Sequence, residues 1–276
     1  MPADDVYAGR PADVGREPRG ASGQASGQTS GQTGGRWRDR LLWALLPAAC
    51  LGCGCPLPAS AALGLCAPCR GRLRPVGGAG GSASCARCAA ELAGSLTASS
   101  VCGRCRARPP AFDRLLALWS YEPPLDAVVR GLKFGRLDYL GRHLGVALAD
   151  ALLPQLDGCD LVVPVPLHWR RRLGRGYNQA ERIARPLACR LDRPLAQVLA
   201  RPRSTPPQSG LGRPERLANP RRAFRPRRRF PLAGRAVLLV DDVATTGATL
   251  DAAAAALKRA GAASVVAVVA GRTPGG

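Results

Sequence analysis

The chain has 276 residues, enough for one large domain or two modest ones, and 46% of them are hydrophobic, so a buried core is expected. No apolar run approaches the ~20 residues of a membrane-spanning helix, and we therefore expect a cytoplasmic protein with no membrane span. The formal net charge of +21 suggests nucleic acid as a partner, but Lys133 and Lys258 are the only lysines among the 40 basic residues. This arginine bias reflects coding composition as much as selection for charge.

The N-terminal part, residues 1–40, is predicted to be a disordered polar tail. Residues 21–32 repeat a four-residue unit of small and polar residues that has no apolar face to bury. The short apolar run 41–49 follows three arginines and precedes Cys50, and it faintly imitates a lipoprotein signal. Its short apolar core, its distance from the first residue and the position of Pro47 favour a short amphipathic helix instead.

Eight of the 11 cysteines form four C-x2-C pairs, and the second four lie 35 or 36 residues after the first four. Two such pairs with a short spacer are typical of a four-thiolate zinc ribbon. Disulfides are the alternative, but the lack of a signal peptide favours reduced thiols. We predict two structural zinc ions bound by consecutive sets, with interleaved pairing as the alternative. The sets are Cys50, Cys53, Cys66 and Cys69, then Cys85, Cys88, Cys102 and Cys105. The other three, Cys55, Cys159 and Cys189, are interpreted as ordinary thiols.

Beyond Pro109 and Pro110 the pattern alternates between strands and helices. Strands are expected at 115–121, 160–165, 195–199, 236–240 and 265–270, and helices at 125–134, 137–153, 178–191 and 250–260. Such alternation predicts an α/β fold with a mainly parallel sheet flanked by helices, and ligands at the carboxyl ends of the strands. We therefore divide the chain into the tail, a double zinc ribbon at 41–108 and an α/β domain at 109–276.

The most specific segment runs from Val237 to Leu250. Four apolar residues predict a buried strand, and the adjacent carboxylates of Asp241 and Asp242 follow it. The next five residues form a small turn before an Ala-rich helix, where backbone N–H groups favour a phosphate. These residues are Thr245, Thr246, Gly247, Ala248 and Thr249. Because carboxylates repel phosphate, we expect the two aspartates to accept hydrogen bonds from ribose hydroxyls. The alternative is an ordinary strand–helix corner in which a threonine caps the helix.

Two further segments complete the predicted site. Arginines follow the strand at 160–165, where a pyrophosphate group would need them. His168, between the strand and these arginines, is equally well explained as a structural histidine. The arginines are Arg170, Arg171 and Arg175. The long loop at 201–230 is rich in Pro and Arg, and it is interpreted as a lid over the ligand or as a disordered basic linker. Its candidate residues are Arg203, Thr205, Gln208, Arg216 and Asn219.

Residues 41–276 resemble the ComF family, which comprises competence-associated, phosphoribosyltransferase-like proteins with an N-terminal double zinc ribbon. The resemblance rests on five features in one order. They are the cysteine pairs with Pro47, Pro164 to His168, Arg175 to Ala180, Thr205 to Leu211, and the 237–250 segment. The resemblance implies a type I phosphoribosyltransferase fold, phosphoribosyl pyrophosphate (PRPP) with Mg²⁺ as ligand, and a link to bacterial DNA uptake. It assigns neither an acceptor base nor a catalytic residue.

Two functions are consistent with these features. The first is an enzyme that transfers the phosphoribosyl group of PRPP to a nitrogen nucleophile with loss of pyrophosphate. The second is a binding module that senses PRPP or a nucleotide, or holds single-stranded DNA, alongside the competence proteins of the transformation machinery. Few aromatic residues lie near the basic segment, which weighs against base stacking and so against the DNA alternative.

Overall fold

The computed structural model describes residues 48–58, 61–77, 83–92, 100–156, 158–201, 223–227 and 230–274. The predicted tail at 1–40, residues 41–47 of the predicted amphipathic helix and the central part of the long loop, 202–222, lie outside the described residues. The same holds for the side chains of Arg170, Arg171 and Arg172, whose backbone belongs to a described helix.

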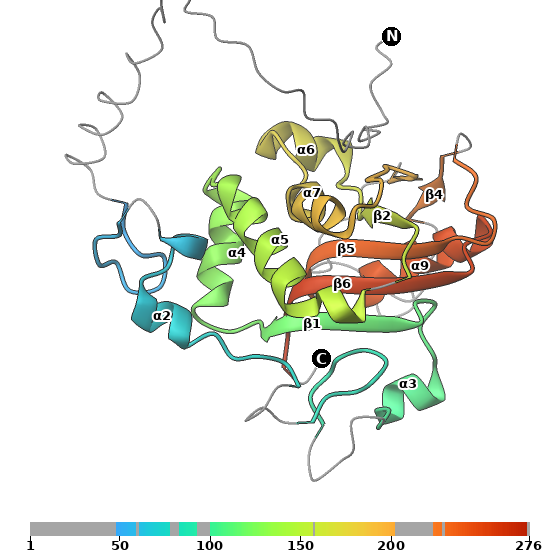
Figure 1. Ribbon diagram of the computed structural model, residues 1–276, viewed down its shortest axis with the longest axis horizontal. Helices are drawn as coiled ribbons and strands as arrows, with labels where there is room; N and C mark the ends of the chain where they lie inside the picture. The colour runs from blue at the N-terminus through green and yellow to red at the C-terminus, as the bar shows by residue number, and fades with distance from the viewer. Residues whose placement is uncertain are drawn as a thin grey trace, which may run out of the picture.

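A four-stranded, fully parallel sheet forms the centre of the fold, in the order β1-β6-β5-β2 (Figure 1). The strands are β1 Arg114–Ser120, β2 Leu161–Pro164, β5 Ala236–Ala244 and β6 Ser264–Arg272. Helices cover both faces of the sheet, so its strands carry near-continuous apolar runs such as 237–240. The predicted α/β fold is therefore confirmed, and the carboxyl ends of all four strands meet at one edge.

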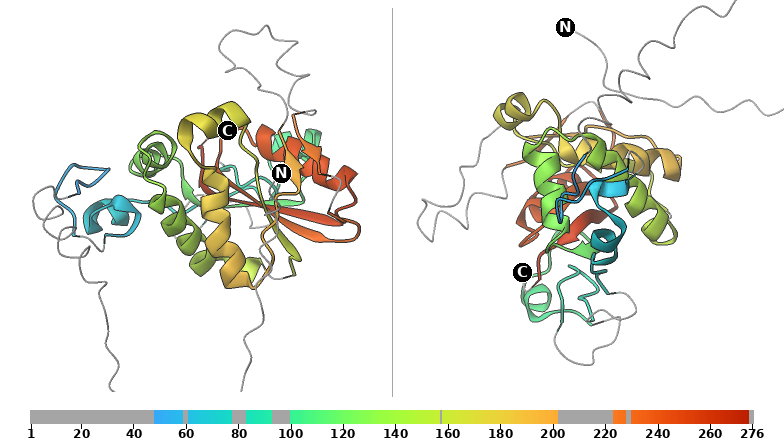
Figure 2. Two further views of the ribbon diagram at one scale, coloured as in Figure 1. Left: turned by 90° about the horizontal axis from the view of Figure 1, so that it is seen from above. Right: turned by 90° about the vertical axis from the view of Figure 1, so that its left-hand side faces the viewer.

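Three helices pack on one face of the sheet, and one long helix packs on the other (Figure 2). On the first face lie α4 Leu125–Phe134, α5 Tyr139–Leu152 and α7 Gln179–Leu191, and on the second lies α9 Ala248–Arg259. Glycines allow α5 and α7 to approach closely, because a Cβ at Gly145 would lie 2.3 Å from the carbonyl oxygen of Ile183.

The remaining elements are short. They are η1 Ala62–Gly64, α2 Ala67–Gly71, α3 Gly103–Ala107, η2 Leu153–Gln155, α6 Trp169–Arg175, β3 Leu199–Ala200 and β4 Arg225–Pro226. Strands β3 and β4 form a separate two-stranded antiparallel sheet at the two ends of the long loop.

The two cysteine sets lie on different faces of the sheet. Cys50 and Cys69 belong to the hydrophobic cluster that includes α4, α5 and Leu238 of β5. Cys85 and Cys88 belong to the hydrophobic cluster on the opposite face of the sheet, which includes residues of α9 and Leu239 of β5. Figure 1 accordingly shows α2 beside α4, and α3 on the other side of β1. Because both sets share a core with the sheet, a domain boundary at residue 108 stays a prediction.

The structure corrects several of the predicted elements. Strand β5 continues through the two aspartates, because its backbone pairs with β6 as far as Ala244 and Arg272. The predicted strand at 195–199 is reduced to a single parallel bridge between Leu195 and Val162, and β3 begins only at its end. Helix α6 and strand β4 were not predicted. Both lie in Arg-rich sequence without an apolar period, so the periodicity on which the predictions depend is lacking there.

Candidate functional site

The two aspartates lie at the carboxyl end of β5, within the strand rather than after it. Successive side chains of a strand point to opposite faces. Asp241 follows the alternation of Val237 and Leu239, which pack on the α9 side, whereas Asp242 follows that of Leu238. A carboxylate is therefore present on each side of the strand end. The hydrophobicity pattern ended the predicted strand too early because backbone pairing does not require apolar side chains.

Asp242 is buried, with 7% of its surface exposed, and it forms an ion pair with α4. Its Oδ1 lies 3.0 Å from Nζ of Lys133 in the last turn of that helix. The sequence had assigned no role to Lys133. Its position one helical turn after the buried Val129 puts it on the apolar face of the helix, but it does not indicate which carboxylate the lysine reaches.

Asp241 is partly buried, and its Oδ1 accepts a hydrogen bond from the backbone N–H of Asp242 at 2.9 Å. Burial and the negative charge of Asp242 raise the pKa of Asp241 to about 7. That backbone N–H, Lys133 and Arg201 act in the opposite direction, and they do not outweigh burial. A carboxylate with such a pKa at the end of a strand is typical of a functional site.

The β5–α9 turn, residues Thr245 to Thr249, leads directly into the 12-residue helix α9. Thr245, Thr246 and Thr249 are exposed. Gly247 has a φ of +78°, a left-handed conformation that favours glycine, and a Cβ there would meet only the ring of Phe112 at 4.0 Å. The turn therefore presents an open surface at a helix N-terminus, where an anion is favoured.

Arginines outside the turn hold its carbonyl groups. Arg272 at the end of β6 is 2% exposed, and its Nη1 donates to the carbonyl oxygens of Ala244, at 3.0 Å, and Thr245. Nη2 of Arg104 in α3 donates to the carbonyl oxygen of Thr246 at 3.0 Å. Neither arginine was predicted to belong to the site. For Arg272 the available signal was a single arginine at the end of an apolar strand. That signal is too weak to identify the carbonyl groups to which the arginine donates.

The segment after β2 leads to the same edge of the sheet. Nδ2 of Asn178 donates to the carbonyl oxygen of Val165 at 3.1 Å, which joins the start of α7 to the end of β2. The Arg175 guanidinium lies 5.0 Å from the ring centroid of Phe134, the residue after Lys133. The structure thus places Arg175 beside the C-terminal end of α4, the helix that carries Lys133. His168 is 4% exposed and lies beside Trp169, as a structural histidine would.

The predicted lid residues Arg203, Thr205, Gln208, Arg216 and Asn219 lie outside the described residues, and so do the side chains of Arg170 and Arg171. These assignments stay predictions. The residues that flank the lid are described: Arg201 lies over the ring of Phe224 at 5.3 Å, next to the β3–β4 pair. The positive charge of Arg201 partly offsets the rise in the pKa of Asp241, so the segment predicted as a lid begins near the strand end.

The eight paired cysteines converge in two groups of four, in the predicted consecutive sets. We call Cys50, Cys53, Cys66 and Cys69 the first cluster, and Cys85, Cys88, Cys102 and Cys105 the second cluster. The sulfur atoms of each cluster lie within 4.8 Å of one another, as ligands of one ion would. Backbone N–H groups also point at sulfur in matching positions of the repeat, from Cys66 to Cys50 and from Cys102 to Cys85, both at 3.3 Å.

These N–H groups stabilise thiolates. Burial opposes ionisation of Cys50, but the backbone N–H groups of Cys66, Cys53 and Gly52 outweigh burial and lower the pKa of Cys50 to about 6. The pKa of Cys85 falls to about 7 for the same reason. Zinc binds thiolates, so both clusters fit a structural zinc ion with four sulfur ligands. Cys55, interpreted from sequence as an ordinary thiol, hydrogen-bonds with two members of the first cluster, Cys53 and Cys66.

Among the residues that the structure describes, no helix has the length and apolar character needed to cross a membrane.

Comparisons with known proteins agree with this geometry. The family model of the phosphoribosyl transferase domain matches residues 174–275. The "DNA utilization protein YhgH" of Salmonella typhimurium is 34% identical over 229 residues, which are 80% of this chain and 95% of that protein. "Competence protein F" of Haemophilus influenzae is 32% identical over 207 residues, 72% of this chain and 86% of that protein. The crystal structure of TT1426 from Thermus thermophilus covers 49% of this chain and 84% of its own, at 21% identity. Its TM-score of 0.32 is too low to support an argument.

Proposed function

Because the chain belongs to the ComF family, we propose that it binds PRPP at the carboxyl end of β5 and recognises or transfers the phosphoribosyl group. One observation carries this proposal. A pair of carboxylates at a strand end is followed directly by an exposed, glycine-containing turn at the N-terminus of a long helix. Separate sites for sugar hydroxyls and for phosphate are thus available next to each other.

The 5-phosphate would bind at the β5–α9 turn. Its backbone N–H groups and the threonine hydroxyls supply hydrogen-bond donors, and the dipole of α9 favours negative charge there. Gly247 leaves room for the phosphate, since its Cβ position faces open space. The residues in this role are Thr245, Thr246, Gly247, Ala248 and Thr249.

The ribose hydroxyls would donate to Asp241 and Asp242. Both carboxylates belong to the strand end, where the Lys133 ammonium group pairs with Asp242. The pyrophosphate, with Mg²⁺ bridging its oxygens as part of the ligand, would lie towards Arg170, Arg171 and Arg175. Guanidinium groups form paired hydrogen bonds with phosphate oxygens, which suits them to this position.

The role of the protein in the cell is proposed from its relatives. Their names concern DNA utilisation and competence, and we extend that link to this chain. A phosphoribosyl ligand and a DNA-related role are compatible, because a PRPP site can act in nucleotide metabolism or as a sensor of nucleotide supply. A screen of purine and pyrimidine bases for release of pyrophosphate separates transfer from recognition.

Calorimetric titration with Mg-PRPP tests the site. In the double variant Asp241→Asn, Asp242→Asn the side chains keep their size but accept weaker hydrogen bonds from the ribose. Each charge-assisted bond contributes about 1.5–3 kcal/mol, so affinity should fall at least tens-fold. Gly247→Val should weaken binding similarly, since a β-branched residue is strained at φ +78° and would stand in the phosphate position.

The matched control is Asp150→Asn on α5. It removes one negative charge from an exposed carboxylate whose ion pair is with Arg190, away from the strand end. Its affinity for PRPP should equal that of the parent. Parent-like affinity in both the aspartate double variant and Gly247→Val would show that the ribose-phosphate assignment is wrong.

A further inference from the structure

Arg272 joins the second cysteine cluster to the β5–α9 turn. It ends β6, and its guanidinium is buried at the edge of the sheet where the turn begins. Nε donates to the carbonyl oxygen of Cys88 at 3.1 Å, while Nη1 donates to the carbonyl oxygens of Ala244 and Thr245. The guanidinium is planar and rigid, so the donors on its two sides hold the two backbone segments in one fixed relation.

Arg104 makes a second connection between the same two parts. It lies between Cys102 and Cys105 in α3, and it donates to the carbonyl oxygen of Thr246 at 3.0 Å. Three consecutive carbonyl groups, those of residues 244 to 246, therefore accept hydrogen bonds from arginines that are anchored at the second cluster.

This arrangement orients the amide groups of the turn. A peptide unit is planar and trans, so its N–H points opposite to its C=O. Carbonyls that are directed at Arg104 and Arg272 turn the N–H groups of Thr246 and Gly247 away from the second cluster, towards the open side of the turn. The two arginines also place positive charge behind a site that would bind an anion.

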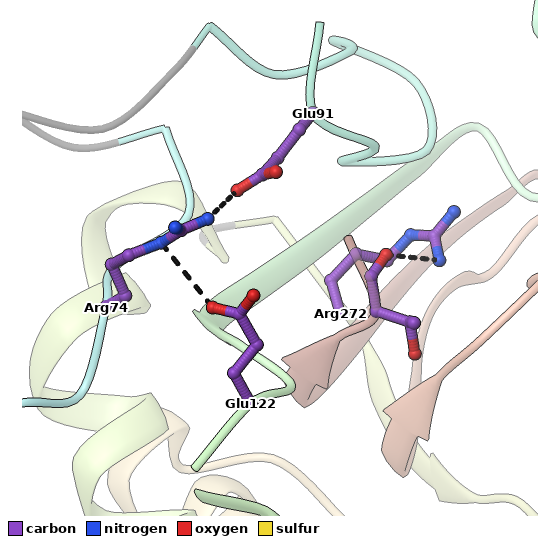
Figure 3. Close-up of polar contacts among 5 residues, drawn as sticks. Arg74, Glu91, Glu122 and Arg272 are labelled. Atoms are coloured by element: carbon purple, nitrogen blue, oxygen red, sulfur yellow. Dashed lines mark hydrogen bonds and ion pairs between the residues drawn. The ribbon is translucent and has the colours of Figure 1, made fainter. Parts of the chain in front are cut away.

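Other contacts brace the second cluster against the sheet. Figure 3 shows Arg74 between Glu91, next to the cluster in sequence, and Glu122, just after β1. The nitrogen–oxygen distances are 2.5 Å to Glu91 and 3.7 Å to Glu122. The backbone N–H of Ala111, which follows the cluster, donates to Asp251 in the first turn of α9 at 2.6 Å. The cluster and the helix that begins at the turn are thus held together.

The first cluster has different neighbours. The backbone N–H of Leu63, between its two cysteine pairs, donates to Nδ1 of His143 on α5 at 3.1 Å. A Cβ at Gly52 would lie 3.1 Å from the side chain of Pro124, just before α4. The two clusters repeat in sequence, but they support opposite faces of the sheet.

We propose that Arg104 and Arg272 are positioning residues through which the second cluster, when it binds its metal ion, holds the β5–α9 turn in the conformation that binds phosphate. The first cluster has no such role. For the identity of the ligand, this inference rests on the proposed function. The order of the turn itself is measurable without any ligand.

Hydrogen–deuterium exchange of the full-length zinc-loaded protein tests the proposal. Arg104→Gln should accelerate exchange of the first hydrogen-bonded amides of α9 several-fold, starting with Asp251, whose N–H donates to the carbonyl oxygen of Gly247 in the turn at 2.9 Å. It should also weaken PRPP binding about tenfold, as expected for loss of one charge-assisted hydrogen bond. Zinc content should stay at the parental value. The control is Arg106→Gln, which removes the same charge from an exposed position two residues further along α3 and should change neither measurement.

A matched pair of cysteine variants compares the two clusters. Cys66 and Cys102 occupy equivalent positions in the repeat, and each replacement by serine should release one ion. Cys102→Ser should accelerate exchange of the first hydrogen-bonded amides of α9, and Cys66→Ser should leave it unchanged. Equal acceleration in both variants, or parental exchange in Arg104→Gln, would overturn the inference whether or not PRPP binds. If the parent fails to bind PRPP but the exchange differences appear, the proposed ligand is wrong and the support of the turn stands.

Discussion

Replacing Asp241 by Asn should make the protein more stable while it weakens ligand binding. The parent carboxylate is partly buried beside Asp242, which raises its pKa to about 7. An aspartate in an unfolded chain has a pKa near 3.9, so the folded protein binds a proton more tightly than the unfolded chain does. Stability therefore falls as pH rises between about 4 and 7, because folding requires a carboxylate to ionise in an unfavourable position.

The size of this effect follows from the two pKa values. A rise of about three pKa units corresponds to about 4 kcal/mol at pH 8, since one unit is about 1.4 kcal/mol. Asparagine has the same shape and still accepts the backbone N–H of Asp242, which lies 2.9 Å from Oδ1. Asp241→Asn should therefore be more stable than the parent by up to about 4 kcal/mol at pH 8. This advantage should grow by about 1.5 kcal/mol between pH 5.5 and 7.

Urea unfolding at pH 5.5, 7 and 8.5, with zinc present throughout, measures this difference. Comparing variant and parent at each pH removes the contributions of the cysteines and histidines, which both proteins share. Asp150→Asn, an exposed site on α5, should show a small difference from the parent that does not depend on pH. An advantage of Asp241→Asn that is constant over this range, or a loss of stability, would refute the reasoning about burial and charge repulsion at the strand end.

Three further predictions concern the ligand, the helix packing and the metal. PRPP affinity of the parent should rise several-fold between pH 6 and 8 in calorimetric titrations, because Asp241 ionises and accepts stronger hydrogen bonds, and Asp241→Asn should lack that rise. Gly145→Ala should lower the unfolding free energy by about 1–3 kcal/mol in urea, since its Cβ would lie 2.3 Å from the Ile183 carbonyl oxygen and α5 must move away from α7. Protein purified without oxygen should contain two zinc ions per chain by metal analysis, and removing them with a chelator should lower the thermal midpoint; well under one ion per chain would contradict the cluster assignment.

The sequence by itself determined the features that depend on local pattern. The C-x2-C spacing predicted which cysteines converge, because each pair is brought together by a single tight turn. Apolar periodicity predicted α4 with its observed bounds and located α5 and α7 to within two residues at each end. The run from Val237 to Leu250 placed two carboxylates next to a turn and a helix N-terminus, since these groups are neighbours along the chain.

Only the tertiary structure decided how distant parts of the chain meet. Nothing near Lys133 indicates that its ammonium group pairs with Asp242, because that contact depends on how α4 packs across the sheet. The repeat makes the two cysteine clusters look equivalent, yet they pack on opposite faces. The hydrogen bonds from Arg104 and Arg272 to the β5–α9 turn join segments far apart in sequence. Local patterns indicate which face of a helix or strand is apolar. Which polar groups contact one another at the strand ends depends on how the whole chain packs.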